Sequence, residues 1–402
     1  MFEINNNIVY VKGAKNGAIY DFNTKKVWSI NNDACEILER YINNISIEKD
    51  YEYLKLLVQN SLINKNFVCK AYLPHSMKQI DFKLAWIEIT DACNLRCIHC
   101  YEGETHSKMN NSLCLAEWKK LIDQLVELNV KTIIVIGGEP TCYKYVGEIL
   151  KYISKFHVKS TLFTNATNIN DDLFNIIVET NTMVKTSVYG HNAELHDSIT
   201  QVKGSFDRMV YNISRLKKAG IDVTSSIIVM RENEQYVDEI IDFTKNLGMN
   251  FNKYDVIRNV YGGSQNLHSP ISEKILNKAF RTSPNFGCSK EYFDSAFSRN
   301  TCWYGKIAIK ENGDVIPCEF ERNIIYGNVK KDSLYNILHS DTLMNYWFLD
   351  FSKIEFCKDC EFRFACKDCR PLGLSVCGNI ATKNPRCTYD PYHGVWESRH
   401  SK

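Results

Sequence analysis

The sequence contains no apolar run of about 18 residues, the length that would predict a membrane-spanning helix. Its N-terminus, Met1-Phe-Glu-Ile-Asn-Asn-Asn, has no basic segment followed by an apolar one, so no secretory signal is predicted. An excess of charge of one sign is also missing, because 49 Lys and Arg against 47 Asp and Glu leave a net charge of +2. This balance favours neither nucleic acid nor a membrane as a partner. We therefore expect a cytoplasmic globular protein.

Cysteine, by contrast, is abundant, with 16 residues among 402. Three cysteines fall between positions 93 and 100, and six fall between positions 357 and 387. In a large chain of the cytosol, clustered cysteines are more often metal ligands than disulfides. The cysteines outside the clusters fit no ligand spacing and are expected to be buried free thiols: Cys35, Cys69, Cys114 and Cys142.

Residues 1–80 are expected to form a small winged-helix-like module. Segments 8–12, 18–22 and 26–30 are short and rich in β-branched and aromatic residues, which is typical of strands. Asn32 and Asp33 are expected to cap a helix, and a second helix is expected from Tyr51. The alternative is a mere N-terminal extension of the main domain.

Residues 81–260 alternate strand-like and helical segments, the pattern of a parallel sheet with helices outside. Six strand–helix units fit a partial (β/α)6 barrel, in which ligands bind at the carboxyl ends of the strands. The expected strands are 84–90, 132–136, 159–164, 183–188, 222–229 and 251–255. Residues 261–402 are expected to be loop-rich, to bury little apolar surface and to depend on metal clusters.

A cysteine motif follows the first strand of this α/β domain: Cys93-Asn-Leu-Arg-Cys97-Ile-His-Cys100. Three thiolates in a C-x3-C-x2-C loop can bind three irons of a cubane [4Fe–4S] cluster. The fourth iron then keeps an open position, as catalytic metal sites require. The alternative is structural zinc, which needs four ligands; Cys114 could supply the fourth, but no C-x2-C pair supports it.

A second motif, Gly137-Gly138-Glu139-Pro140, ends the second strand about 40 residues further on. Glycines let the backbone approach a ligand closely, and a carboxylate can accept from a charged amine. By itself the motif is also compatible with an ordinary turn.

Together, the cysteine loop and the Gly-Gly-Glu-Pro turn resemble the signature of the radical S-adenosylmethionine (SAM) superfamily. The resemblance implies that SAM chelates the open iron and that Gly137, Gly138, Glu139 and Pro140 bind its amino group. Thr164 and Asn165 match a polar pair after the third strand. Ser187 and Arg208 match the positions that hold the SAM carboxylate, although Arg208 could also be a solvated helix residue.

The C-terminal cysteines resemble the SPASM domain, which carries two auxiliary [4Fe–4S] clusters in peptide-modifying radical SAM enzymes. Cys302, Gly313 and Cys318 stand as C-x10-G-x4-C, and Cys357-x2-Cys360-x5-Cys366-x2-Cys369 follows. The resemblance implies one cluster on Cys302, Cys318 and Cys369, with Cys288 or a substrate thiolate as fourth ligand. It implies another on Cys357, Cys360, Cys366 and Cys387, with Cys377 as an alternative to Cys387. A pair of zinc sites is the other interpretation.

Glu319, directly after Cys318, takes the place of an aspartate that acts as a base in sulfatase maturases. This likeness implies that Glu319 accepts a proton, and the alternative is a surface carboxylate.

Segments 11–21, 360–371 and 384–392 also resemble the SPASM maturases of grasp-with-spasm systems, which modify ribosomally synthesised and post-translationally modified peptides (RiPPs). The resemblance implies that residues 1–80 are a RiPP recognition element, which binds the leader of a precursor peptide as an added strand. It also implies an electron donor such as flavodoxin or ferredoxin, and hydrogen abstraction by a 5′-deoxyadenosyl radical.

Thioether formation is the reaction we expect, with carbon–carbon crosslinking, epimerisation and formylglycine formation as alternatives. Two interpretations without catalysis remain: an iron–sulfur electron carrier and a zinc-scaffold protein that delivers the precursor. The SAM-binding turn at residues 137–140 argues against the electron carrier.

Overall fold

The computed structural model describes residues 1–45, 51–64, 66–74, 80–101, 112–251, 253–258, 260 and 267–397. The chain forms two compact units, each made of separate stretches of sequence. The first unit comprises Met1–Ile80, Phe280–Tyr304 and Asn345–Lys402, and the second comprises Asp81–Ala279 and Gly305–Met344. The N-terminal module and most of the C-terminal cysteines therefore share one unit.

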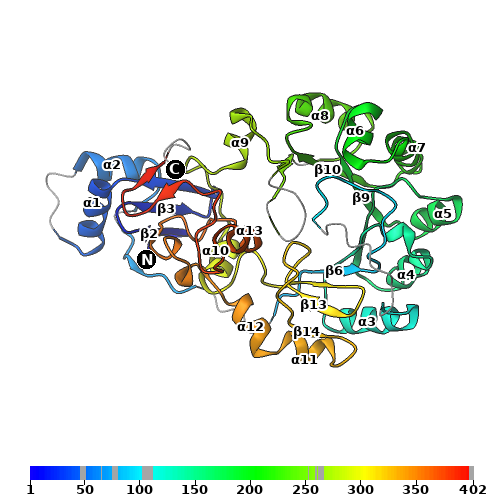
Figure 1. The fold of residues 1–402 in the computed structure, drawn as a ribbon. Helices are drawn as coiled ribbons and strands as arrows, with labels where there is room; N and C mark the ends of the chain where they lie inside the picture. Colours follow the sequence, from blue (N-terminus) through cyan, green and yellow to red (C-terminus); the bar gives the residue numbers. More distant parts are fainter. Residues whose placement is uncertain are drawn as a thin grey trace. The chain divides into compact units, whose positions relative to one another are not determined.

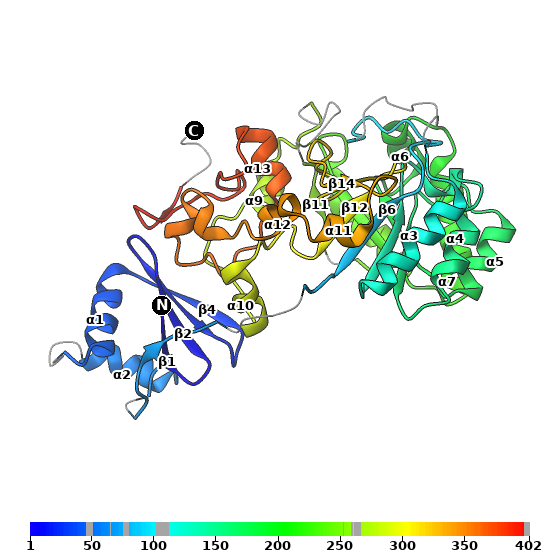
Figure 2. The same ribbon diagram turned by 90° about the horizontal axis from the view of Figure 1, so that it is seen from below.

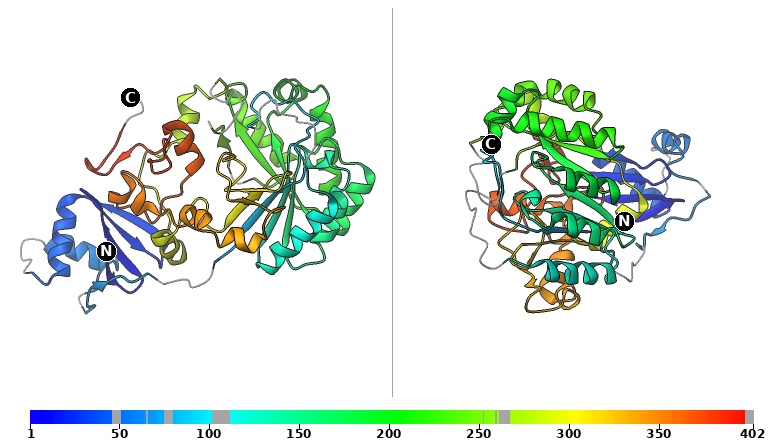
Figure 3. Two further views of the ribbon diagram at one scale, coloured as in Figure 1. Left: turned by 60° about the horizontal axis from the view of Figure 1, so that its bottom comes forward. Right: turned by 90° about the vertical axis from the view of Figure 1, so that its right-hand side faces the viewer.

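The second unit is built on parallel strands that pair in sequence order, as the alternating pattern predicted. These strands are β6 (Leu84–Glu88), β7 (Thr132–Ile136), β8 (Lys159–Phe163), β9 (Met183–Val188), β10 (Val223–Val229) and β11 (Asp255–Val256). Helices form an arc outside them (Figures 1 and 3). They are α3 (Leu115–Glu127), α4 (Val146–Ile153), α5 (Asp171–Glu179), α6 (Ala193–Thr200), α7 (Ser205–Lys218) and α8 (Val237–Asn246). The expected strand at 251–255 is wrong in its extent, since β11 begins only at Asp255.

The same sheet continues into the C-terminal third of the chain. β12 (Lys306–Ile309) pairs in parallel with β6, and β13 (Asp314–Ile316) and β14 (Gly327–Asn328) follow antiparallel, which gives nine strands in all. The sequence did not predict these strands, because segments of two to four residues carry too little periodicity. The other helices after residue 260 are α9 (Glu273–Ala279), α10 (Lys290–Ser298), α11 (Leu334–Leu338), α12 (Asp341–Trp347) and α13 (Arg370–Cys377).

The first unit contains a five-stranded antiparallel sheet in the order β4-β3-β2-β1-β5. Its strands are β1 (Phe2–Asn5), β2 (Ile8–Lys12), β3 (Gly17–Asp21), β4 (Lys26–Ile30) and β5 (Lys70–Ala71). Two helices, α1 (Asn32–Ile42) and α2 (Tyr51–Gln59), follow β4. The N-cap of α1 is Asn31, whose side chain accepts from the Ala34 amide, so the predicted cap at Asn32 and Asp33 is wrong.

Each face of this sheet packs against a different part of the chain. Because side chains alternate along a strand, Tyr10 and Ile19 face α1 and α2, whereas Val9 and Tyr20 face the C-terminal segments. Figure 2 shows α1 and α2 on one side of the sheet and α10 on the other. The Tyr20 hydroxyl donates a hydrogen bond of 2.8 Å to the Glu361 carbonyl oxygen. The N-terminal sheet is thus part of the same core as the cysteine-rich segment.

The expectation that the C-terminal third buries little apolar surface is wrong. Five of its aromatic residues have at most 2% of their surface exposed: Phe293, Trp303, Tyr304, Trp347 and Phe362. These residues are scattered along the sequence and meet only through tertiary packing, so no local pattern indicated a core. A short hairpin of β15 (Tyr389–Asp390) and β16 (Val395–Trp396) completes this region. In the described ranges, no helix is long and apolar enough to cross a membrane.

Candidate cofactor-binding sites

The loop that carries Cys93, Cys97 and Cys100 follows β6, where it is pinned by backbone hydrogen bonds to two other segments. Within the loop, the Arg96 and Ile98 amides donate to the carbonyl oxygens of Thr200 and Ile199 at 3.0 and 3.1 Å. At its start, the Ala92 carbonyl oxygen accepts from the Glu139 amide at 2.8 Å. The end of α6 and the Gly-Gly-Glu-Pro turn therefore hold the loop in place.

The three thiols of this loop influence one another. Burial raises the pKa of Cys93 to about 12 and also raises the pKa of Cys97, and the negative charge of neighbouring thiolates, Cys100 included, raises both further. Among the residues that the structure describes, no three His, Cys, Asp or Glu side chains gather closely enough to hold a single metal ion. Binding an iron–sulfur cluster here requires loss of the thiol protons, because the thiolate is the ligand.

Gly137 and Gly138 lie directly against the strand end that leads into the cysteine loop. A Cβ atom at Gly137 would lie 2.3 Å from the Thr90 carbonyl oxygen, and one at Gly138 would lie 2.5 Å from the Asp91 carbonyl oxygen. Both contacts are too short for any side chain, so only glycine lets the two segments meet. The glycine pair thereby sets the distance between the cysteine loop and Glu139.

The Glu139 carboxylate is buried and links three segments. Its Oε1 accepts from the Thr141 amide at 3.0 Å, from the Thr141 hydroxyl at 2.7 Å and from the Thr164 hydroxyl at 2.5 Å. Its Oε2 accepts from the Asn165 amide at 2.7 Å. Burial raises the pKa of this carboxyl, and these hydrogen bonds oppose the shift. The sequence predicted Glu139, Thr164 and Asn165 as separate SAM contacts, and the structure joins them in one network.

Asn94, which the sequence analysis missed, extends this network into the cysteine loop. Its side-chain Oδ1 accepts from the Asn165 side-chain Nδ2 at 2.8 Å, and its own Nδ2 donates to the Thr167 hydroxyl at 2.9 Å. Its position directly after Cys93 was the only signal in the sequence.

Aromatic rings gather beside the cysteine loop. His99 contacts Tyr189 edge to face with ring centroids 4.6 Å apart, and Tyr189 contacts the buried His196 at 5.6 Å. Burial lowers the pKa of both histidines to about 4, so both imidazoles are neutral near pH 7. Of the two residues predicted to hold the SAM carboxylate, Ser187 is half-buried in β9 and Arg208 is exposed on the first turn of α7.

Glu319 has an interior position rather than that of a surface carboxylate. In the described part of the chain, its Oε2 is buried without a hydrogen-bond partner. Burial raises the pKa of Glu319 to about 7, against the opposing charges of Arg258 and Lys185. Lys185 lies 4.9 Å from the centroid of the Phe163 ring, and Arg258 lies equally far from the Phe320 ring. The charges of Lys185 and Arg258 thus act on a carboxylate that has one fully buried oxygen.

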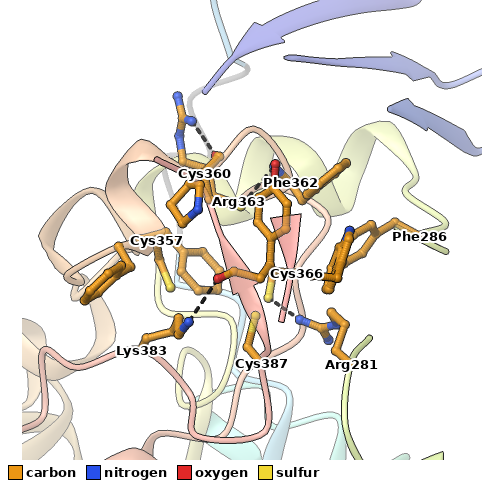
Figure 4. A pocket seen from close by; sticks show the side chains of 14 residues that line it. Arg281, Phe286, Cys357, Cys360, Phe362, Arg363, Cys366, Lys383 and Cys387 are labelled. Carbon is orange, nitrogen blue, oxygen red and sulfur yellow. Dashed lines mark hydrogen bonds between the residues drawn. The ribbon is translucent and has the colours of Figure 1, made fainter. Parts of the chain in front are cut away.

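The first unit contains a cavity of about 30 Å³ lined by four cysteines (Figure 4). These are the four that the resemblance assigns to one cluster: Cys357, Cys360, Cys366 and Cys387. Cys377 is exposed and does not line the cavity. The rest of the wall is largely aromatic: Phe286, Phe351, Phe356, Phe362, Tyr389 and Trp396. Four thiols around a cavity of this kind fit a cubane cluster with no open iron.

The cysteines of the other auxiliary set belong to both units. Cys302 and Cys369 belong to the first unit and Cys318 to the second, so their assignment to one cluster remains a prediction. Cys288 is buried in the apolar core beside Phe293, and its thiol donates to the Phe364 carbonyl oxygen at 3.4 Å. The structure does not bring Cys288 to the four-cysteine cavity.

The remaining thiols divide between the interior and the surface. Cys35 is fully buried, as expected of a free thiol in a core. Cys114 is exposed at the N-cap of α3, so its predicted burial is wrong. Cys69 and Cys142 are partly buried.

Comparison with known proteins finds two families that match parts of the chain. Residues 87–244 match the radical SAM superfamily, and residues 302–361 match the iron–sulfur cluster-binding domain named SPASM. The AdoMet-dependent heme synthase of Oleidesulfovibrio alaskensis is 26% identical over 77% of this chain and 87% of its own length. The subtilosin biosynthesis protein AlbA of Bacillus subtilis is 26% identical over 72% of this chain and 68% of its own.

A solved structure shares the fold over nearly the whole chain. Streptococcus suis SuiB, crystallised with its precursor peptide SuiA, superimposes with a TM-score of 0.60 and 15% identity. The superposition covers 97% of this chain and all of SuiB. The chain thus contains a radical SAM domain at residues 87–244 and a SPASM domain at residues 302–361. It is a radical SAM enzyme, and its cofactors are SAM and [4Fe–4S] clusters.

Proposed function

We propose that this enzyme modifies a ribosomally synthesised precursor peptide by joining a cysteine sulfur to a peptide carbon as a thioether. The observation that carries the proposal is the N-terminal sheet, which offers an edge strand to a peptide and shares a core with the cysteine-lined cavity. Two similar proteins support it, since AlbA is named for bacteriocin biosynthesis and SuiB binds a precursor peptide. Because the relatives also include a heme synthase, a haem precursor is the alternative substrate to be tested.

Residues of the second unit would hold the reactive cofactors. Cys93, Cys97 and Cys100 would bind a [4Fe–4S] cluster with one open iron, at which SAM supplies a 5′-deoxyadenosyl radical after reduction by one electron. Gly137, Gly138, Glu139, Pro140, Thr164, Asn165, Ser187 and Arg208 are the proposed SAM contacts. The glycine pair and the Glu139 network keep Glu139, Thr164 and Asn165 at one end of the parallel strands, which we infer to curve as a partial barrel.

Glu319 is the proposed proton acceptor. One oxygen of its carboxylate is buried, and the charges of Lys185 and Arg258 favour its ionised form. In thioether formation the radical takes one hydrogen atom from carbon, the thiol loses its proton, and one electron is left over when the carbon–sulfur bond forms. Glu319 would take the proton, and an auxiliary cluster would take the electron.

The peptide leader is proposed to dock on β4, with residues 1–80 acting as a winged-helix-like RiPP recognition element. β4 is an edge strand, and in the described ranges its outer side is bridged only at Lys26, by Gly287. Trp28 in the middle of the strand is 39% exposed. An extended peptide can add to such an edge through backbone hydrogen bonds, while an aromatic side chain gives it a contact surface.

Flavodoxin or ferredoxin is the proposed electron donor, and the cytoplasm the proposed location.

The test uses the anaerobically reconstituted full chain with cysteine-containing precursor peptides encoded beside its gene. We expect 5′-deoxyadenosine, a peptide lighter by two hydrogens, and one free thiol fewer. A carbon–carbon crosslink would keep the thiol, epimerisation would leave the mass unchanged, and formylglycine would be seen as an aldehyde. Turnover of a haem precursor with no change in any peptide would overturn the proposal. The Cys93/Cys97/Cys100→Ala variant is expected to lose about four of roughly twelve irons, together with SAM cleavage.

Docking on β4 is tested separately by the affinity for the leader peptide. Trp28→Ala should weaken binding by about 30-fold, the loss typical of a central aromatic contact of ~2 kcal/mol. Tyr335→Ala, which removes another exposed aromatic side chain, is the matched control and should change nothing. Equal affinities for Trp28→Ala and the wild type would place the leader elsewhere.

A further inference from the structure

Arg281 contacts two of the four cysteines that line the cavity of the first unit, Cys366 through its side chain and Cys387 through its backbone. Its Nη1 donates a hydrogen bond of 2.6 Å to the Cys366 Sγ, and its Nη2 donates to the Lys367 carbonyl oxygen at 3.2 Å (Figure 4). Its backbone pairs with the segment around Cys387, because the Arg281 amide donates to the Arg386 carbonyl oxygen at 2.8 Å. The guanidinium lies 5.1 Å from the centroid of the Phe286 ring, which further restricts its orientation.

Two other cations line this cavity, but their hydrogen bonds are of a different kind. Lys383 donates to the Tyr389 carbonyl oxygen at 2.9 Å, and Arg363 donates to the Cys360 carbonyl oxygen at 2.6 Å. Both side chains donate to backbone carbonyl oxygens, whereas Arg281 donates to a cysteine sulfur. The contact between Arg281 and Cys366 is partly buried, and a hydrogen bond is electrostatically stronger inside a protein than in water.

We propose that Arg281 raises the reduction potential of the iron–sulfur cluster that Cys357, Cys360, Cys366 and Cys387 would hold. Reduction by one electron adds one negative charge to the cluster and its thiolates. A cation that donates to one of those sulfurs stabilises the reduced form more than the oxidised form, and hydrogen bonds to sulfur are an established determinant of cluster potentials. The aromatic wall by itself has the opposite effect, since burial disfavours the more highly charged form. Arg281 is therefore a positioning and tuning residue rather than a catalytic one.

This inference rests on the proposed assignment of the four cysteines to one cluster, which iron counting checks independently. The Cys387→Ala variant should contain about four irons fewer than the wild type. If it contains as many irons as the wild type, the assignment fails and the tuning role with it. If the irons are lost, the assignment stands. The redox signal that is present in the wild type and missing from Cys387→Ala then belongs to this cluster.

The experiment is an anaerobic redox titration followed by electron paramagnetic resonance, on the reconstituted full chain and three variants. In Arg281→Gln, the ratio of reduced to oxidised cluster at a fixed potential should fall about tenfold, which is a negative shift of about 59 mV for a one-electron couple. Arg281→Lys keeps the charge and should shift the same cluster by less. Lys383→Gln removes a charge from the same cavity without removing a bond to sulfur, and should also shift it by less.

Three results would overturn the proposal. The first is an unchanged potential in Arg281→Gln with all irons present. The second is an equal shift in Lys383→Gln, because net charge alone would then explain the effect. The third applies if the Arg281→Gln variant loses the cluster. An unchanged cluster potential in Arg281→Lys would then show that Arg281 stabilises the site without tuning the potential.

Discussion

The Glu139 carboxylate accepts a hydrogen bond of 2.7 Å from the backbone amide of Asn165, and thereby joins the ends of the neighbouring strands β7 and β8. Together with the two hydroxyl donors and the Thr141 amide, this bond gives the carboxylate four hydrogen bonds within the protein. Glu139 thus organises the polar groups around the proposed SAM site. This role accounts for a buried carboxylate at a turn that is otherwise defined by glycine.

Glu139→Gln should destabilise the second unit and reduce SAM cleavage. The amide group turns N–H donors toward groups that also donate, and each lost bond to a charged acceptor costs about 1.5–3 kcal/mol. We expect a lower melting temperature and a loss of 5′-deoxyadenosine production of at least about tenfold. Glu148→Gln, at a solvent-exposed position on α4, is the control. Wild-type SAM binding and cleavage in Glu139→Gln would contradict the role of this network.

The choice between Cys377 and Cys387 can be made by iron analysis of two single variants. Cys387→Ala removes one of the four thiols that line the cavity and should lose about four irons, the content of one cubane cluster. Cys377→Ala changes an exposed thiol and should keep the full iron content. If the losses are reversed, Cys377 rather than Cys387 is the ligand.

Arg322 and Glu88 form a bidentate ion pair that joins the loop of Glu319 to strand β6. The two N–O distances are 2.8 and 2.9 Å, and only 10% and 2% of the side chains are exposed. Arg322→Met should cost about 3–5 kcal/mol, because it leaves a buried carboxylate without this partner. Urea unfolding of the full chain measures the loss, and adding Glu88→Gln should recover part of it. Lys245→Met, from an exposed pair with Asp242, should cost less than about 1 kcal/mol. A similarly small cost for Arg322→Met would show that the pair does not fasten the loop.

Asp197 should make part of the stability of the second unit dependent on pH. Burial alone would raise its pKa, but bonds from the Phe206 amide, the Ser205 hydroxyl and the Gly204 amide outweigh burial and lower it. Because the folded-state pKa is below the unfolded value of about 3.9, this stabilisation is present above about pH 4 and is lost as the pH falls further. Melting temperatures of the wild type and Asp197→Asn should therefore converge at acidic pH. A constant difference down to about pH 3 would contradict this account.

Much of the α/β domain could be predicted because its signals are local. The apolar runs of β7 and β9 and the alternation of strands with helices lie within segments of a few residues each. The cysteine loop and the glycine pair are also local, since a ligand spacing or a glycine turn needs only neighbouring positions. The short strands β12 to β14 had no such signal and form because β12 pairs with β6 over 200 residues earlier in the chain.

By itself, the sequence determined which chemistry the chain can carry: a three-cysteine loop with an open position, a glutamate turn and a set of C-terminal thiols. Only the tertiary structure decided which of those thiols meet. It placed Cys387 in the cavity and Cys377 outside, put Cys288 in an apolar core, and brought Arg281 to the Cys366 sulfur. The physical reason is that each of these contacts joins residues far apart in the chain. Such contacts form only when packing of the whole unit offsets the entropy lost in closing the intervening loops.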